Sequence, residues 1–252
     1  RQITTIDVPP LEDGELVIAS DVPMPDKFPT DPDLGISVEA LSFSRSVQIY
    51  QWREHQETST NGDTRYSYSK DWADSPISSS FFHDPRYSNS GSLPFRDRTF
   101  RPDSYTFGDL KLDKAFASSF PSSKKLAVTR EMHDQMPSYF QQRFSIVGGD
   151  LFPNRDPRIG DIRVRFSYVP PRQSTVVGAY SDGSIVPAAT EAGTIAILRE
   201  GNLSLDELVA AEKSSNRTTG VILKVIAALF AVGGVVTAAL ALRGGAARRE
   251  SV

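Results

Sequence analysis

The sequence predicts an α+β fold: a β-rich, antiparallel extramembrane domain with a few short helices, followed by a transmembrane helix. Three observations support this prediction. Seventeen glycines and seventeen prolines among 252 residues interrupt the chain too often for long helices. Residues 162–168 alternate between apolar and polar side chains, which is typical of a half-buried strand. Residues 221–242 are almost entirely apolar.

The apolar segment from Val221 to Leu242 is the strongest local signal. After Lys224 it contains eighteen consecutive uncharged residues, and as a helix it spans about 27 to 33 Å, close to the hydrocarbon thickness of a bilayer. It predicts a transmembrane helix, because helices buried in soluble domains rarely run so far without a charge. The expected organisation is an extramembrane domain over 1–219, a transmembrane helix over 220–242 and a basic tail over 243–252.

Small side chains recur along the predicted transmembrane helix at steps of three and four residues. Such a stripe lies on one helical face and lets a second helix approach closely. An alanine-rich span also produces a stripe of this kind by chance, so both interpretations stay open. The stripe consists of Ala227, Ala231, Gly234, Ala238 and Ala241.

Charge and composition exclude several classes of function. The chain has no cysteine, which excludes disulfides, thiolate metal sites and thiol nucleophiles. Residues 220–252 carry four basic side chains and one acidic one, so the rest of the chain is more acidic than the net charge of −3 indicates. An acidic body does not suit nucleic acid. The three histidines are scattered and no catalytic motif is present, so we expect no catalytic residue, metal or cofactor.

A β-hairpin is predicted around Asn61-Gly62. The pair separates residues 42–56, which alternate between apolar and polar side chains, from the strand-like residues 64–68. Asn-Gly is a common hairpin turn because both residues tolerate positive φ. A two-residue turn at this pair places His55 opposite Tyr68, and a longer loop is the alternative.

Five aromatic side chains fall on the predicted hairpin. Aromatic rings on a sheet can stack on a sugar or a base, although they more often pack against each other. If they line a groove, Asp71 or Asp74 is an acid–base candidate for an enzyme. The five possible interaction aromatics are Tyr50, Trp52, Tyr66, Tyr68 and Trp72.

The remaining elements are short. Residues 75–109 are rich in Ser, Asp, Arg, Pro and Gly and predict irregular connections, whereas 113–119 and 124–135 have compositions compatible with helices. Strand-like runs at 174–180 and 194–198 favour an antiparallel meander.

A capping box begins the last helix of the extramembrane domain. Ser204 and Glu207 have the spacing in which each side chain satisfies the other's backbone N–H, and a helix to Ser214 follows. Asn202 and Asn216 are glycosylation acceptors if the domain lies in a eukaryotic secretory lumen.

Short motifs occur along the chain in a recognisable order. They are Tyr50-Gln51-Trp52, Arg65-Tyr66-Ser67-Tyr68 with Trp72, Ser80-Phe81, Gly160-Asp161-Ile162-Arg163-Val164 with Phe166-Ser167-Tyr168, Gly201 with Ser204, and Ser215-Asn216. In this order they resemble the LUMA family, that of transmembrane protein 43 and its relatives. The resemblance covers about residues 10 to 242.

The resemblance implies a large domain in the lumen of the endoplasmic reticulum and nuclear envelope, with membrane helices on both sides of it. This sequence shows a single span where the family has several. Family members of the inner nuclear membrane organise the nuclear envelope and bind lamins and emerin, and prokaryotic relatives carry the domain outside the plasma membrane. In a eukaryote the resemblance therefore implies the endoplasmic reticulum or inner nuclear membrane, and in a bacterium the plasma membrane with a periplasmic domain.

The residues and the resemblance together predict a non-enzymatic, membrane-anchored scaffold. It would assemble membrane protein complexes through its luminal or periplasmic domain. The expected partners are the lipid bilayer, further copies of the chain or other membrane proteins, with lamin- or emerin-type partners only at a eukaryotic nuclear envelope, and no nucleic acid. The alternative is a membrane-tethered enzyme or binding module that acts on glycan or lipid.

Overall fold

The structure is a computed structural model that describes residues 11–90, 92–190 and 193–214. This part of the chain is rich in strands and has only short helices, which confirms the coarse fold class predicted from sequence. It divides into two compact units. Unit 1 contains the described residues up to 28, those of 102–122 and those from 169 onward, and unit 2 contains those of 29–101 and 123–168.

Unit 1 is built on one sheet in the order β1-β14-β15-β9-β8-β2. A further strand, β18, pairs with the first residues of β14 on the edge away from β1. The β15–β9 pair is parallel, so the predicted simple antiparallel meander is wrong for this unit. The bounds are β1 Leu16–Asp21, β2 Met24–Pro25, β8 Tyr105–Phe107, β9 Leu110–Leu112, η1 Lys114–Ser119, β14 Ser174–Ser181, β15 Ser184–Val186, β16 Ala188–Thr190, β17 Gly193–Ile195, β18 Ile197–Glu200 and α3 Leu205–Ser214.

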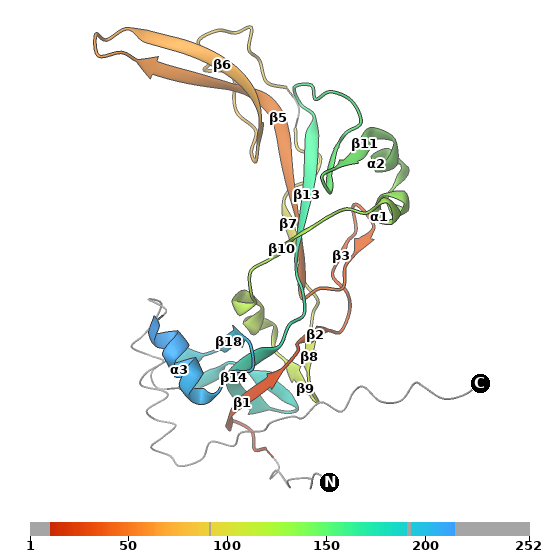
Figure 1. Cartoon of the computed structure of the whole chain (residues 1–252), viewed down its shortest axis with the longest axis vertical. Helices are drawn as coiled ribbons and strands as arrows, with labels where there is room; N and C mark the ends of the chain where they lie inside the picture. The colour runs from red at the N-terminus through yellow and green to blue at the C-terminus, as the bar shows by residue number, and fades with distance from the viewer. Residues whose placement is uncertain (1–10, 91, 191–192, 215–252) are drawn as a thin grey trace, which may run out of the picture. The chain divides into compact units, whose positions relative to one another are not determined.

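Unit 2 is built on a second sheet in the order β11-β12-β13-β5-β6, with β10 paired to β13 and β7 paired to β5. Its two longest strands, β5 and β6, form a hairpin (Figure 1). The bounds are β3 Thr30–Asp31, β4 Ile36–Ser37, β5 Ser42–Thr58, β6 Thr64–Ala73, β7 Arg98–Phe100, β10 Lys124–Leu126, α1 Arg130–Gln135, α2 Ser138–Arg143, β11 Phe144–Val147, β12 Asp150–Pro153 and β13 Ile162–Val169.

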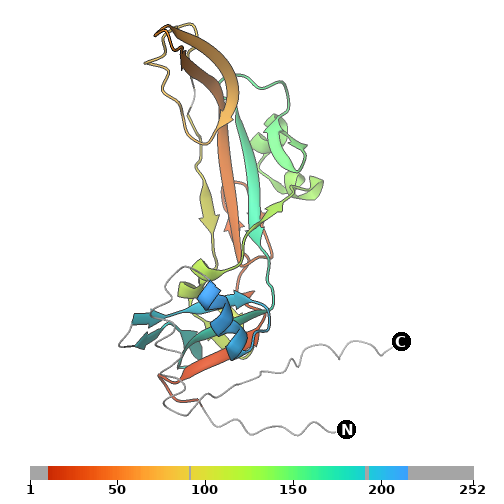
Figure 2. The ribbon, with the colours of Figure 1, turned by 60° about the vertical axis from the view of Figure 1, so that its left-hand side comes forward.

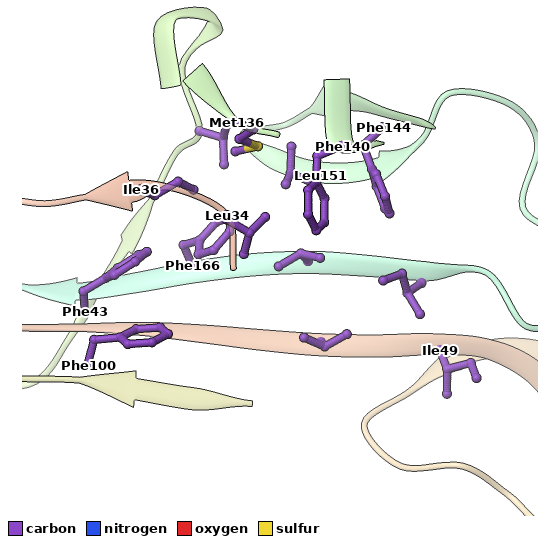
Figure 3. Close-up of a cluster of buried hydrophobic side chains, with 14 residues drawn as sticks. Leu34, Ile36, Phe43, Ile49, Phe100, Met136, Phe140, Phe144, Leu151 and Phe166 are labelled. Carbon is purple, nitrogen blue, oxygen red and sulfur yellow. The ribbon is translucent and has the colours of Figure 1, made fainter. Parts of the chain in front are cut away.

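The hydrophobic core of unit 2 lies against one face of this sheet. The Phe43 ring stacks on Phe100 at 5.7 Å and on Phe166 at 5.5 Å between ring centroids. Phe140 of α2 and Leu151 of β12 point toward the same cluster (Figure 3). Because side chains alternate along a strand, the even-numbered residues of this part of β5 lie on the opposite face of the sheet.

A buried ion pair also lies on the core side of β5. The Arg45 guanidinium donates to both carboxylate oxygens of Asp31 at 2.6 and 2.7 Å, and the two side chains are at most 2% exposed. Asp33 accepts a further hydrogen bond at 2.9 Å. Burial raises the pKa of Asp31, and the nearby Arg45 charge offsets part of that rise. Alternation alone predicts an apolar residue at position 45, so this cation is a feature that the pattern did not reveal.

The local predictions had mixed outcomes. The alternating run 162–168 forms β13. The capping box is confirmed, since Ser204 N donates to Glu207 Oε2 at 2.8 Å and Glu207 N donates to Ser204 Oγ at 3.3 Å. The helix predicted over 124–135 is only half correct, because its first residues join the edge of β13 as β10 and only Arg130–Gln135 is helical.

The membrane prediction falls outside the part of the chain that the structure describes. Residues 220–242, the small-residue stripe on them, the tail 243–252 and Asn216 all lie beyond the described residues. Among the helices that are described, none is long and apolar enough to cross a bilayer.

Candidate functional site: the aromatic face of the β5–β6 hairpin

The loop of the hairpin fixes which residues face each other. It contains the five residues 59–63, closed by hydrogen bonds from Ser59 N to Asp63 O and from Gly62 N to Ser59 O. A two-residue turn was therefore the wrong alternative. Because the register differs by one residue, Tyr68 lies opposite Glu54 and not opposite His55. A slip of one residue moves a side chain to the other face of a strand, so this difference decides the chemistry of the face.

The hairpin register places all five predicted interaction aromatics on one face, which we call the aromatic face. Tyr50 pairs with Trp72, and their rings lie 5.1 Å apart. Trp52 pairs with Lys70, whose ammonium group lies 4.7 Å from the centre of the indole ring. The sequence correctly placed the five side chains on the hairpin, but only the observed register, and not the two-residue turn, brings them to one face. The aromatic face consists of Tyr50, Trp52, Tyr66, Tyr68 and Trp72.

The chain itself covers much of this face. Residues 77–89, which we call the cover segment, follow β6 and run back along the hairpin (Figures 1 and 2). Tyr87 stacks on Tyr68 with 3.8 Å between the ring centroids and meets Trp52 edge-on at 4.8 Å. His83 stacks on Tyr66 at 4.2 Å. The rings on β5 and β6 thus have aromatic partners from within the same unit.

The carboxylate of Glu54 joins the cover segment to the hairpin. Glu54 Oε2 accepts hydrogen bonds from Tyr68 Oη and from the His83 backbone N–H, both at 2.6 Å. The Asp84 N–H donates in turn to Tyr68 Oη at 2.9 Å. Partial burial and the hydrogen bond to Glu54 raise the pKa of Tyr68. The phenol is therefore held in its neutral form as both a donor and an acceptor.

Asn89 protects the edge of β5. The backbone groups of Tyr50 pair with Asp161 O and Gly160 N, and beyond this point β13 no longer accompanies β5. Two residues further along, Asn89 Oδ1 accepts from Trp52 N at 2.7 Å and its Nδ2 donates to Trp52 O at 3.0 Å. The side-chain amide thus replaces one peptide group of a neighbouring strand and blunts an open edge.

A second side-chain amide holds the start of the cover segment. Gln51 is only 2% exposed. Its Nε2 donates to Ser75 O at 2.7 Å and its Oε1 accepts from Ile77 N at 2.9 Å. Asn89 Nδ2 also donates to Ile77 O at 3.1 Å. Both backbone groups of Ile77 are therefore paired, so this irregular segment has a defined position.

A cation packs at the Trp72 end of the aromatic face. The Arg163 guanidinium lies 4.9 Å from the centre of the Trp72 ring and 5.6 Å from that of Phe152. Arg163 Nε also donates to Gln48 Oε1. Burial and the nearby charge of Arg165 lower the pKa of Arg163. The negative electrostatic potential on the faces of the Trp72 and Phe152 rings attracts the guanidinium, and this cation–π interaction helps to position Arg163.

The acid–base candidates have other partners. Asp71 is exposed and accepts the backbone N–H of Trp72 at 2.7 Å. Asp74 is also exposed and accepts from Gln48 Nε2 at 2.6 Å. Adjacent residues of a strand point to opposite faces, so Asp71 lies on the face opposite Trp72. In the described part of the chain, no group of three or more His, Asp or Glu side chains is placed to hold a metal ion.

Several residues of this site were missed by the sequence reasoning. Tyr87, His83 and Asn89 lie in a stretch that composition predicted as an irregular connection, and no local signal shows that such a loop returns to a hairpin. Glu54 is different, because its even-numbered position on β5 places it on the aromatic face by alternation. Asn202, one of the two glycosylation candidates, lies exposed two residues before Ser204, the residue that caps α3.

Comparison with known sequences places this chain in a family. The family model described as Transmembrane protein 43 matches residues 49–244, which include β5 from Ile49 onward, all of β6 and the cover segment. No solved structure is detectably similar.

Individual relatives agree with the family match. The chain is 25% identical over 232 residues to Transmembrane protein 43 of Homo sapiens and to that of Mus musculus, and each match covers 83% of this chain and 56% of the relative. It is also 25% identical over 201 residues to the Drosophila melanogaster homologue, which covers 73% and 51% of the two chains. The chain spans about half the length of these relatives. Since the family model matches more than half of the chain, the protein belongs to the Transmembrane protein 43 family, also called the LUMA family.

Proposed function

We propose that the chain is a non-enzymatic, membrane-anchored scaffold that assembles membrane protein complexes through its extramembrane domain. Family membership supports a membrane location. The apolar segment 221–242 supplies the proposed anchor. The proposed compartment is the endoplasmic reticulum or inner nuclear membrane in a eukaryote and the plasma membrane in a bacterium. Further copies of the chain, other membrane proteins and, at a nuclear envelope, lamin- or emerin-type proteins are the proposed partners.

One observation carries this proposal: the rings that were candidates for stacking on a ligand instead pack against the chain's own cover segment. Trp52 and Tyr68 both contact Tyr87. The same segment exposes Phe81, which is 91% accessible beside the packed ring of Phe82. Aromatic side chains, Phe among them, are enriched at protein interfaces, so Phe81 is the proposed contact residue. The alternative, a groove acting on glycan or lipid, needs these rings open and has less support.

The experiment that tests this proposal places a photoreactive amino acid at position 81 of the full chain in its native membrane. A scaffold gives discrete protein adducts from this position, including adducts between two copies of the chain if it self-assembles. The matched control is position 147, because Val147 is 53% exposed at the end of β11 in the same unit. Phe81→Ser should also reduce the size of the complex in mild detergent. A monomeric chain that gives identical adducts from both positions would refute the scaffold.

A further inference from the structure

The face of the unit 2 sheet that lies opposite the hydrophobic core carries a polar hollow. Its volume is about 500 Å³. Four adjacent strands supply its walls, and all of them belong to unit 2. The lining residues used in the argument are Ser44 and Ser46 of β5, Lys125 of β10, Asp150 of β12, and Arg165 and Ser167 of β13.

Strand alternation explains why these polar groups meet. Val164 and Phe166 of β13 face the core. Arg165 and Ser167 alternate with them and therefore face the opposite side of the sheet, where the hollow lies. Leu151 pairs with Val164, which places the preceding residue of β12, Asp150, beside Arg165.

The neighbouring strands add a second cation and further hydroxyl groups. Lys125 pairs with Ser167 in the β10–β13 register, so the two side chains share a face. Ser44 and Ser46 have even numbers on β5 and lie on the side away from Phe43 and the core. The hollow is therefore a direct product of the sheet register.

One carboxylate, that of Asp150, lies near both cations of the hollow, and Lys125 Nζ also donates to Gly148 O at 2.8 Å. Lys125 Nζ lies 2.9 Å from Asp150 Oδ1, and Arg165 Nε lies 3.5 Å from Asp150 Oδ2. Neither contact has the orientation of a hydrogen bond, since Asp150 Oδ1 and Arg165 Nε are both buried atoms without a hydrogen-bond partner among the described residues. Lys124 also lines the hollow, but it precedes Lys125 on β10 and its side chain alternates to the other face, so two cations face one carboxylate.

We propose that this hollow binds a phosphate group. The side chains of Arg165 and Lys125 are 43% and 55% exposed, so the accessible N–H groups of the guanidinium and the ammonium can donate to a phosphate oxygen, which supplies a compensating charge. The guanidinium fits a tetrahedral oxyanion through several N–H groups, and the lysine adds a point charge. The serine hydroxyls donate to the remaining oxygens. Soluble phosphate monoesters and phospholipid headgroups share this chemistry. The site does not depend on the scaffold function.

The test is calorimetric titration of the full chain in a nonionic detergent with inorganic phosphate and, separately, with glycerol 3-phosphate. Arg165→Gln should weaken binding about tenfold or more, because one charged hydrogen-bonding group is lost. Asp150→Asn should tighten binding, because the competing carboxylate loses its charge. The matched control is Arg65→Gln on β6, which removes the same charge from an exposed position outside the hollow and should leave affinity unchanged.

The outcomes separate the sources and decide the proposal. Titration with short-chain phosphatidic acid in the same detergent separates the sources: tighter binding of this lipid than of glycerol 3-phosphate supports a lipid headgroup, and equal binding supports a soluble phosphate monoester. If Arg165→Gln does not fold, Lys125→Gln, whose side chain is 55% exposed in the native protein, must weaken binding instead. Absence of saturable binding by all three ligands would overturn the site. Equal weakening by Arg65→Gln and Arg165→Gln would also overturn it, since diffuse charge would then explain the affinity.

Discussion

The two halves of β5 are held in different ways. The first half, up to Ile49, lies over the hydrophobic core and pairs with β7 at residues 43–45. The second half, from Tyr50, pairs with β6 and is held on its other edge by the amide of Asn89. Apolar burial is non-directional and strong, whereas stacking and side-chain hydrogen bonds are weaker and depend on geometry. This difference predicts that β5 combines a stable base with an extension that opens separately.

The largest effect is expected at the base. Arg45→Met removes the cation and leaves the buried carboxylate of Asp31 without its partner, which should lower the free energy of unfolding by about 3 to 5 kcal/mol. Urea unfolding of the full chain measures this change. The matched control is Arg53→Met, which alters an exposed position in the second half of the same strand and should change stability by less than about 0.5 kcal/mol. Equal losses from the two variants would contradict the distinction between the halves.

Loss of the edge amide should open only the second half. Asn89→Ala leaves the N–H and C=O of Trp52 without their partner and should cost about 1 to 3 kcal/mol of local stability. Hydrogen exchange of peptides from residues 50–58 should become faster, while peptides from residues 42–49 keep their protection. Asn61→Ala in the exposed hairpin loop serves as the control. Faster exchange over the whole strand would show that the halves are one cooperative unit.

The stacked pair on the aromatic face should contribute less. Tyr87→Leu removes stacking on Tyr68, and the coupling energy between these two positions should be about 0.5 to 1.5 kcal/mol. A double-mutant cycle with Tyr68→Leu, read from hydrogen exchange of the hairpin, measures it directly. A coupling near zero would mean that the two rings touch without stabilising the cover segment.

The smallest effect is a dependence on pH in the cover segment. Hydrogen bonds from the side chain and backbone N–H of Arg86 lower the pKa of Asp84 below its ordinary value. The stability that this ionised carboxylate provides is complete above the ordinary aspartate pKa and is lost as the pH falls through the lowered value. Acidification should therefore loosen residues 77–89 before the base of β5. Asp84→Asn should remove this pH dependence. Hydrogen exchange of residues 77–89, measured at several pH values, tests this, and a pH dependence that remains in the variant would contradict the assignment to Asp84.

The sequence predicted the parts of this architecture that depend on local pattern. Alternation predicted β13, and the spacing of Ser204 and Glu207 predicted the start of α3. The Asn61-Gly62 pair located the hairpin but not its register, because loop length is set by the whole turn and not by one favourable dipeptide.

Contacts between distant residues were not predictable in the same way. Nothing in the local sequence links Asn89 to Trp52, which lies 37 residues earlier. Asp150 and Arg165 meet in the polar hollow only because β12 and β13 pair with one particular register. The features that distinguish this unit thus arise from tertiary pairing.

Tryptophan fluorescence tests the central claim most directly, because the only two tryptophans of the chain, Trp52 and Trp72, both lie on the aromatic face. If the cover segment packs on this face, acrylamide quenches the native full chain much less than the urea-unfolded chain, and Asn89→Ala increases quenching without unfolding the base of β5. Quenching of the native chain as strong as that of the unfolded chain would show an open face and contradict the account.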